Sequence, residues 1–317
     1  MKKKIKVMVI SIVVIVLITD IFAGNYFYNL AIKREQKDFL QGNEDLTVSA
    51  TAMDVFLQGG WRQWVSQQDF NEWELESFDR QNLKGYYLEA KEPTNKTVML
   101  AHGYLGKAKD MGLYGQYYYE ELGYNIFMPD ARGHGQSEGD YIGFGWHDRL
   151  DWIDWTEKII KYTGAETQII WHGLSMGGAT VLMASGEEHP ENVELIVSDS
   201  AYTNVYELFQ YQLKRMYNLP AFPILPTSNL ITNLRAEYSL VEASALEQVK
   251  NAQVPIIYFH GNNDSFVPAK MAEELYRHTA TDKDLILFDN AGHGEAYAIH
   301  EEKYQEHLKK TLLKYID

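Results

Sequence analysis

The sequence predicts an α/β protein with a mostly parallel sheet flanked by helices, and three observations support this class. Short, continuously apolar runs alternate with segments of helical spacing from about residue 75 to the C-terminus. Hydrophobic residues make up 45% of the 317 residues, which allows one large core. One long stretch, residues 203–250, interrupts the alternation and predicts an inserted segment.

Each expected strand is a short apolar run that ends in turn-forming residues. These strands cover residues 84–90, 97–103, 125–130, 168–174, 193–200, 254–261 and 284–290. Helical spacing lies between or after them, at residues 109–123, 147–164, 175–188, 268–280 and 300–316. Because apolar strands that alternate with helices form parallel sheets buried on both faces, we expect helices on both sides of the sheet.

The interrupting segment, residues 203–250, is rich in aromatic residues and contains Pro220, Pro223 and Pro226. Loops of an α/β sheet carry many of its substrate contacts. We therefore expect this segment to form a helical cap over the functional site.

Residues 1–34 predict an N-terminal membrane segment. Four lysines within the first six residues precede an apolar run from Val7 to Gly24, close to the roughly 20 residues of a spanning helix. We expect an uncleaved signal-anchor, a transmembrane helix in the cell membrane, with residues 35–317 as a single extracytoplasmic catalytic domain. The alternative is a signal peptide cleaved after Ala23, which would release a secreted protein.

The residues that follow the anchor also have helical spacing. Residues 26–75 predict a juxtamembrane helical stretch that carries Trp61, Trp64 and Trp73. We expect these tryptophans to pack in the core or to face the membrane.

The formal net charge is −15, from 29 basic and 44 acidic side chains. Residues 1–34 hold six basic residues and one acid, so the rest of the chain carries 23 basic and 43 acidic side chains. Such an anionic domain repels phosphate backbones, and we expect no nucleic-acid partner. The chain has no cysteine, which excludes disulfides, cysteine-ligated zinc, iron–sulfur clusters and a thiol nucleophile.

The strongest signal for chemistry is the run Gly173-Leu174-Ser175-Met176-Gly177, which lies between an expected strand and an expected helix. In this context Gly-x-Ser-x-Gly predicts a nucleophile elbow, whose turn holds the serine in a strained conformation at a helix N-terminus. The flanking glycines remove side chains that would clash with neighbouring elements. We therefore expect Ser175 to be a nucleophile.

A serine hydroxyl needs a base to take its proton, and the base needs an acid to fix its tautomer. Asp264 and His293 follow the last two expected strands, in loops where sheets of this class place their sites. The chain order Ser175, Asp264, His293 suits a catalytic triad. Asp199, which follows the preceding strand, is the alternative acid.

A tetrahedral oxyanion requires two hydrogen-bond donors. We expect these to be the backbone N–H of Met176, directly after the nucleophile, and that of Tyr104 in the loop after residues 97–101. We expect His102 to orient that loop.

A second loop, residues 130–139, contains small residues that allow a tight turn beside the site. We expect structural roles there for Asp130, Arg132 and His134. The sequence has no phosphate-binding loop, no dinucleotide-binding motif after the first strand, no His-Glu-x-x-His and no calcium-loop spacing. We therefore expect no cofactor and no metal ion.

Five motifs, in this order and spacing, resemble those of the α/β-hydrolase superfamily: HGYLG, DARGHGQSEG, GLSMGG, HGNNDSFVP and AGHGEAY. The resemblance covers residues 75–317. The N-terminal anchor, residues 237–261 and the final GHGEAY are similar to the YqkD-like or BEM46-like extracytoplasmic hydrolases of Gram-positive bacteria. Asn263 departs from the pattern, because relatives often carry an acidic or a different polar residue before the triad aspartate.

The resemblance implies an α/β-hydrolase fold with an eight-stranded, mostly parallel sheet, and ester-type hydrolysis through an acyl-enzyme. It implies Ser175 as nucleophile, His293 as base and then acid, and Asp264 as the residue that orients His293. It also implies oxyanion donors at Tyr104 and Met176. It does not identify a substrate.

We expect a serine hydrolase, a carboxylesterase that acts on small-molecule or lipid-like acyl esters. The expected cap has aromatic residues that suit an apolar acyl group, namely Tyr206, Phe209, Tyr211, Tyr217 and Phe222. A peptidase, a thioesterase or an acyltransferase at the cell envelope is the alternative, because each uses the same triad. A non-catalytic surface binding protein is the third possibility, but loss of activity normally removes a triad member.

Overall fold

Eight strands form one sheet in the order β1-β2-β4-β3-β5-β6-β7-β8 in the computed structural model, which describes residues 2–35, 37 and 48–316. The strands are β1 (Asn71–Glu76), β2 (Asn82–Leu88), β3 (Lys96–Ala101), β4 (Asn125–Pro129), β5 (Gln168–Leu174), β6 (Val193–Asp199), β7 (Ile256–Gly261) and β8 (Lys283–Phe288). β1 and β2 run antiparallel to their neighbours, and the other pairs are parallel. The predicted eight-stranded, mostly parallel sheet is therefore confirmed.

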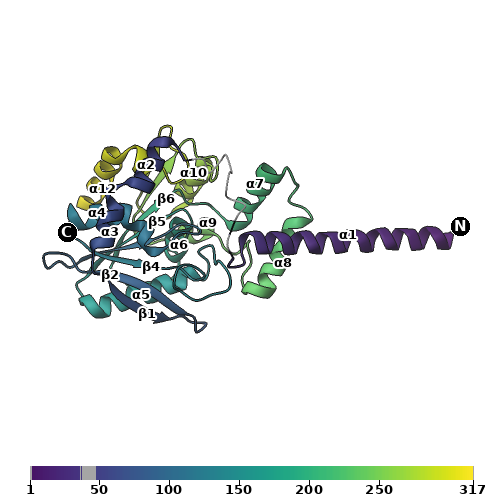
Figure 1. Cartoon of the computed structure of the whole chain (residues 1–317), viewed down its shortest axis with the longest axis horizontal. Coiled ribbons are helices and arrows are strands. Elements are labelled where there is room, and N and C mark those ends of the chain that lie inside the picture. The colour runs from purple at the N-terminus through teal and green to yellow at the C-terminus, as the bar shows by residue number, and fades with distance from the viewer. Residues whose placement is uncertain (1, 36, 38–47, 317) are drawn as a thin grey trace.

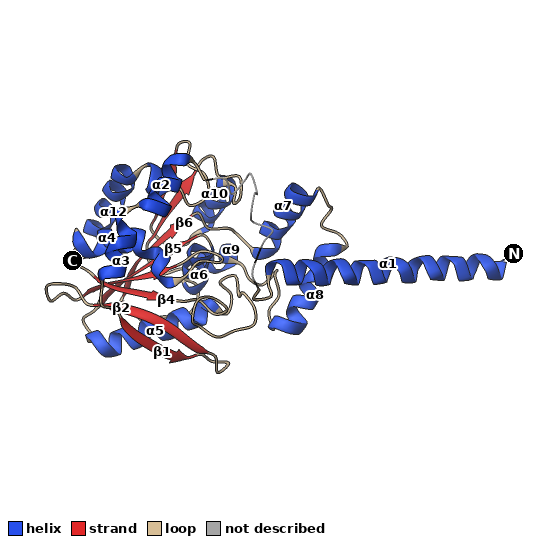
Figure 2. Ribbon diagram, in the orientation of Figure 1, coloured by secondary structure: helices blue, strands red, loops and turns tan. Residues whose placement is uncertain are grey.

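Helices cover both faces of the sheet (Figure 2). One face packs on α2 (Ala50–Gln58), α3 (Gly60–Gln67), α4 (Gly112–Glu120), α11 (Ala296–Ile299) and α12 (Glu301–Tyr315). The other packs on α5 (Asp148–Thr163), α6 (Met176–Ala184), α9 (Ala245–Gln248) and α10 (Ala269–His278). Successive strand residues point to opposite faces, so Ile169 and Trp171 of β5 join one core and Ile170 joins the other.

The expected helical stretch over residues 26–75 is wrong at its end, because Trp73 lies on β1. This strand is at the edge of the sheet, and its residues NEWELE are partly or fully exposed. Trp73 stacks on Tyr87 of β2 with ring centroids 4.8 Å apart. Polar residues on an edge strand give little apolar periodicity, which is why the strand escaped prediction. Residues 38–47 of that stretch lie outside the described part of the chain.

Helix α1 (Lys2–Ala31) projects from the sheet-containing body (Figure 1). By length and composition it could cross a membrane. Between β6 and β7 the chain forms α7 (Val205–Tyr217) and α8 (Ile224–Ala236), and α8 packs against α1. We call α7 and α8 the cap. The helix that begins the chain continues past Gly24, and its last turns join the cap instead of forming a separate juxtamembrane element.

Candidate active site

Ser175 occupies a sharp turn between β5 and α6. Its φ is +56°, a left-handed conformation that is costly for a residue with a side chain. A Cβ atom on Gly173 would lie 2.1 Å from the carbonyl oxygen of Gly177, and one on Gly177 would lie 2.1 Å from that of Ala101. The turn is therefore possible only with glycine at both positions, and it presents Ser175 at the N-terminus of α6.

The structure brings Ser175, His293 and Asp264 into one chain of hydrogen bonds. The Ser175 hydroxyl lies 2.8 Å from His293 Nε2, and His293 Nδ1 lies 2.7 Å from Asp264 Oδ2. His293 follows β8 and Asp264 follows β7, so two neighbouring parallel strands deliver them to the same edge of the sheet. With Nδ1–H donating to the carboxylate, His293 Nε2 is free to accept the serine proton.

Asp264 is buried and fully hydrogen-bonded. Its Oδ1 accepts the backbone N–H groups of Phe266 and Val267 at 2.9 and 2.7 Å, and His260 Nε2 lies 3.3 Å from its Oδ2. Burial by itself would raise the pKa of Asp264, but the charge on His293 and the hydrogen bonds from His260 and His293 lower it well below its usual range. The carboxylate therefore stays ionised beside His293.

His260 is a site residue that the sequence did not single out. It is buried on β7, and its Nε2–H donates to the carbonyl oxygen of Val267 at 2.8 Å while facing Asp264. The sequence feature that could have identified His260 is its position at the end of β7, four residues before Asp264 in the loop that follows. It braces the loop that carries Asp264.

The alternative acid, Asp199, makes other contacts. Its carboxylate accepts hydrogen bonds from the hydroxyls of Tyr114 at 3.1 Å and Ser200 at 2.8 Å, deep in the core. Its backbone carbonyl accepts the N–H of Ser175 at 2.7 Å. Asp264, and not Asp199, contacts His293, and Asp199 supports the turn below Ser175.

The loop after β3 lies beside Ser175. A Cβ atom on Gly103 would lie 3.5 Å from Ser175 Cβ, and the two expected oxyanion donors, Tyr104 and Met176, line the same pocket as Ser175. His134 fixes this loop, because its Nε2 accepts the N–H of Leu105 at 3.3 Å.

Two histidines lock the loops after β3 and β4 together. His102 Nε2 accepts the N–H of Ala131 at 3.0 Å, and the rings of His102 and His134 lie 5.0 Å apart. Burial, together with the electrostatic effect of the neighbouring His102 ring, lowers the pKa of His134 to about 3. His134 is therefore neutral at physiological pH, as its acceptor role requires.

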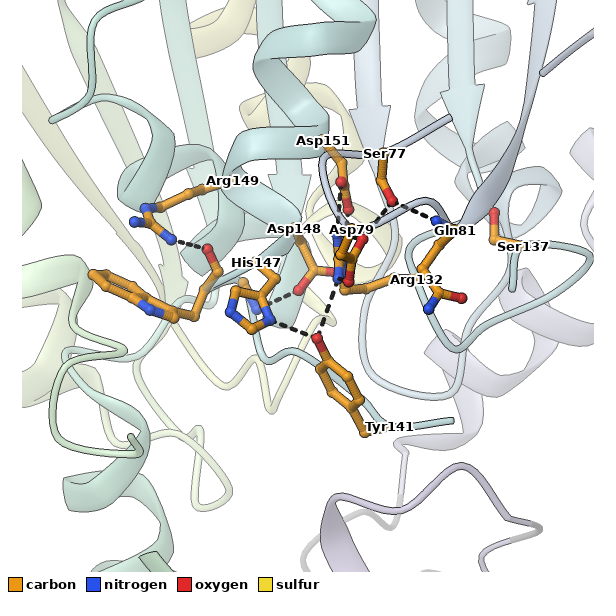
Figure 3. Close-up of polar contacts among 12 residues, drawn as sticks. Ser77, Asp79, Gln81, Arg132, Ser137, Tyr141, His147, Asp148, Arg149 and Asp151 are labelled. Atoms are coloured by element: carbon orange, nitrogen blue, oxygen red, sulfur yellow. Dashed lines mark hydrogen bonds and ion pairs between the residues drawn. The ribbon is translucent and has the colours of Figure 1, made fainter. Parts of the chain in front are cut away.

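Arg132 holds the loop after β4 to α5 and to the β1–β2 turn (Figure 3). Its guanidinium donates to both carboxylate oxygens of Asp151 at 2.8 and 2.7 Å and to Asp79 at 2.8 Å. Burial alone would lower the pKa of Arg132, but the hydrogen bonds and charge of Asp151 raise it. Arg132 thus serves as a buried structural cation. Asp130 is structural too, since it accepts the N–H groups of Ala108 and Gln136, each at 2.8 Å.

An apolar pocket opens at Ser175. About 890 Å³ of atom-free space lies in it, including its open mouth. The cap, α1 and the loops around the elbow line it, with Phe27, Leu30, Tyr104, Phe144, Phe209, Leu213, Met216, Tyr217, Ile224 and Leu225 among the lining residues. Of the expected cap aromatics, Phe209 and Tyr217 line the pocket, whereas Phe222 is exposed.

Gln212, in the pocket wall, has a side-chain oxygen that is available to accept a hydrogen bond. Gln212 donates from Nε2 to the carbonyl oxygen of Phe266 at 2.6 Å, while its buried Oε1 accepts no hydrogen bond from the described residues. A bound alcohol can donate to this oxygen. Among the described residues, no group of three or more His, Cys, Asp or Glu side chains is arranged to hold a metal ion.

Comparisons with known proteins agree with this architecture. The chain is 28% identical over 240 residues to the uncharacterized protein YqkD of Bacillus subtilis. The matched region covers 74% of this chain and 75% of YqkD. It is 25% identical over 205 residues to the lysophosphatidylserine lipase ABHD12 of Danio rerio, covering 63% of this chain and 51% of that protein.

Among solved structures, the Pyrococcus furiosus esterase Pf2001 superposes with a TM-score of 0.65 at 21% identity, over 80% of this chain and 94% of the esterase. At this identity the likeness establishes the fold and not the substrate. Residues 112–317 match the prolyl oligopeptidase family, Peptidase_S9. This match covers more than half of the chain and includes Ser175, Asp264 and His293. The protein is therefore an α/β-hydrolase of the prolyl oligopeptidase family, and it resembles the YqkD-like and BEM46-like proteins.

Proposed function

We propose that the protein is a membrane-anchored serine esterase that hydrolyses apolar acyl esters. The observation that carries the proposal is the hydrogen-bonded chain Ser175–His293–Asp264 at the base of an apolar pocket. The pocket wall offers aromatic and aliphatic side chains to an acyl group, and its lining among the described residues includes no charged side chain.

Catalysis begins when His293 Nε2 takes the proton of Ser175 and the serine oxygen attacks the ester carbonyl. The backbone N–H groups of Tyr104 and Met176 stabilise the oxyanion that forms. His293 then gives its proton to the alkoxide, the C–O bond breaks, and the alcohol leaves an acyl-Ser175 ester. Asp264 stabilises the imidazolium in each transition state.

Deacylation repeats these steps with water as the nucleophile. His293 takes a proton from water, the hydroxide attacks the acyl carbonyl, and the proton returns to Ser175 as the carboxylic acid departs. The reaction consumes one ester and one water and yields one acid and one alcohol. A peptidase, a thioesterase or an acyltransferase would share the acylation step, but the backbone amides of a peptide would find few partners in so apolar a wall.

We propose further that α1 anchors the enzyme in the cell membrane with residues 35–317 outside the cytoplasm. The four lysines at its start and its apolar length support this orientation. A form cleaved after Ala23 and secreted is the alternative, and the mass of the N-terminal peptide from purified protein distinguishes the two.

Labelling with a fluorophosphonate probe tests the nucleophile. We expect the full-length protein in detergent micelles to be labelled, and Ser175→Ala to be unlabelled with a loss of about 10⁴-fold or more in kcat for ester hydrolysis. Ser265→Ala, which alters an exposed serine beside Asp264, is the matched control and should behave as wild type. Labelling of the Ser175→Ala variant would refute the assignment, and a panel of ester, thioester and peptide substrates would decide the bond.

A further inference from the structure

The last turns of α1 form one wall of the pocket that holds Ser175. Phe27, Leu30 and Ala31 line this pocket together with the cap. The Tyr104 hydroxyl donates to the carbonyl oxygen of Ala31 at 2.8 Å, which ties the helix to the loop beside the nucleophile. The helix that carries the apolar span of the chain is therefore also part of the candidate active site.

Helix α8 fixes the position of α1. A Cβ atom on Gly24 would lie 2.7 Å from Thr227 Cγ2, so the two helices approach closely, and Asp20 accepts a hydrogen bond from the Thr227 hydroxyl. Arg235 donates to Asn25 Oδ1 at 2.8 Å. The crossing lies beside the exposed part of α1 (Figure 1).

The length of the exposed part sets the height of the pocket above a bilayer. A run of exposed apolar side chains on α1 extends from Ile5 to Phe22, and Tyr26 is exposed one turn further along. At about 1.5 Å per residue this segment spans about 27 Å, close to the roughly 30 Å of a hydrocarbon core. Phe27, which lines the pocket, follows about 7 Å further along the axis. The pocket thus begins within about two helical turns of the hydrocarbon boundary.

The cap exposes apolar side chains next to α1. Phe222, Leu230 and Leu234 are 77%, 59% and 72% exposed, and the two leucines lie one turn apart on the same face of α8. We call these three residues the cap surface. Large exposed apolar side chains on and before a helix that packs against an apolar helix fit a lipid interface and not water.

The charge of the cap agrees with a lipid interface. The whole chain carries −15, whereas α7 and α8 hold three basic side chains and one acidic side chain: Lys214, Arg215, Arg235 and Glu207. Basic side chains are attracted to anionic headgroups, and the acidic body is repelled by them. The charge distribution therefore favours contact of the cap, and not of the body, with a membrane.

We propose that the cap surface rests in the membrane interface and that the pocket is filled from the bilayer. On this proposal, which rests on the proposed esterase function, the substrate is a membrane lipid ester whose acyl chain already lies in a leaflet. The chain passes between α1 and the cap until its ester carbonyl reaches Ser175. Hydrolysis by water then yields a fatty acid and the lipid alcohol.

A single-cysteine probe tests the surface without any requirement for activity. Because the chain has no cysteine, Leu234→Cys can be labelled with an environment-sensitive nitrobenzoxadiazole group in the full-length protein in phosphatidylcholine–phosphatidylglycerol vesicles. Leu313→Cys is the matched control, since Leu313 is 76% exposed on α12, at the far end of the body from α1 (Figure 1). We expect nitroxide-bearing lipids to quench the label at 234 and not at 313. Equal, weak quenching at both positions would overturn the proposal.

A second experiment tests the route of the substrate. Relative to wild type, the double variant Leu230→Asn/Leu234→Asn should hydrolyse a long-chain ester embedded in vesicles about tenfold more slowly and a soluble short-chain ester at the same rate. Leu313→Asn should match wild type on both. An equal rate of all three proteins on the vesicle-borne ester would refute filling from the bilayer. Absence of fluorophosphonate labelling and of hydrolysis of either ester by wild type would instead refute the esterase function, while quenching at 234 still reports on the surface.

Discussion

The sheet-containing body and the cap differ in the side chains that surround the candidate site. In the body, buried polar groups fix each loop: Asp264 accepts two backbone N–H groups, and Arg132 joins two carboxylates. The cap and the end of α1 cross closely at Gly24 and share hydrogen bonds, and their apolar side chains line most of the pocket. Some apolar side chains of the cap stay exposed. In the proposed function, the body holds the reacting atoms at set distances and the cap accepts the acyl chain.

In the proposed esterase, this difference separates two properties that catalysis needs. Rate depends on the geometry of the triad, which the body fixes by hydrogen bonds. Substrate choice depends on the shape of the pocket, most of which comes from the cap and α1. Changes in the body should therefore alter kcat, and changes in the cap should alter the preference among acyl chains.

The largest effect is expected from Asp264→Asn. The amide cannot carry the charge that stabilises the His293 imidazolium and favours the wrong tautomer of the imidazole, so kcat should fall by about 10⁴-fold with little change in KM. Steady-state hydrolysis of a short-chain ester measures this. Asp289→Asn, at an exposed aspartate near the same sheet edge, is the control and should retain activity. Full activity of Asp264→Asn would return Asp199 to consideration.

The second effect is a loss of stability in acid, which we expect of the body and not of the cap. The buried histidines lie in the body, and residues 205–236 of the cap contain no histidine. Burial lowers the pKa of His172 to about 3 and, together with His102, that of His134 to about 3. An unfolded histidine titrates near pH 6.5, so between about pH 6.5 and 3 the unfolded state binds more protons and stability falls as pH falls. Each histidine should cost about 2 kcal/mol of unfolding free energy at pH 5.

Thermal unfolding of the full-length protein at pH 7 and pH 5 measures this loss. The decrease in Tm between the two values should be smaller for His172→Gln than for wild type. His278→Gln, which changes an exposed histidine, should show the wild-type decrease. An identical decrease in all three proteins would show that buried histidine does not set the acid sensitivity of the body.

The smallest effect is expected from Phe209→Ala in the cap. Phe209 lines the pocket and packs edge-on against Phe144, with ring centroids 5.1 Å apart. Its loss removes apolar contact from a long acyl chain, so the ratio of kcat/KM for octanoyl over butanoyl esters should fall about tenfold. Leu313→Ala should leave the ratio as in wild type. An unchanged ratio in Phe209→Ala would show that this cap side chain does not select the length of the acyl chain.

Much of the body was predictable because its signals are local. The strands at residues 84–90 to 284–290 are apolar runs and correspond to β2 through β8. The turn at Ser175 was predictable because only glycine fits at 173 and 177, and that requirement is visible as a motif. The proximity of Asp264 and His293 to Ser175 was predictable because both follow strands that end at the same edge of the sheet.

The features that escaped prediction depend on contacts between distant segments. Strand β1 has too little apolar pattern to be distinguished from the helix before it. The pocket wall made by Phe27 and Leu30 requires α1 and α8 to cross at Gly24, and nothing in either segment alone specifies that crossing. His260 gains its place beside Asp264 only when the loop after β7 folds back.

The continuity of α1 from Lys2 to Ala31 limits where the enzyme can work. A catalytic domain on a flexible tether searches a deep zone above the membrane, whose depth grows with the length of the tether. In the proposed arrangement α1 spans a bilayer and its last turns are built into the pocket, so the catalytic domain would stand at one height and move only sideways, with its helix. The pocket would then meet only substrates in a thin layer next to the bilayer, and it would not reach polymers held farther from the membrane.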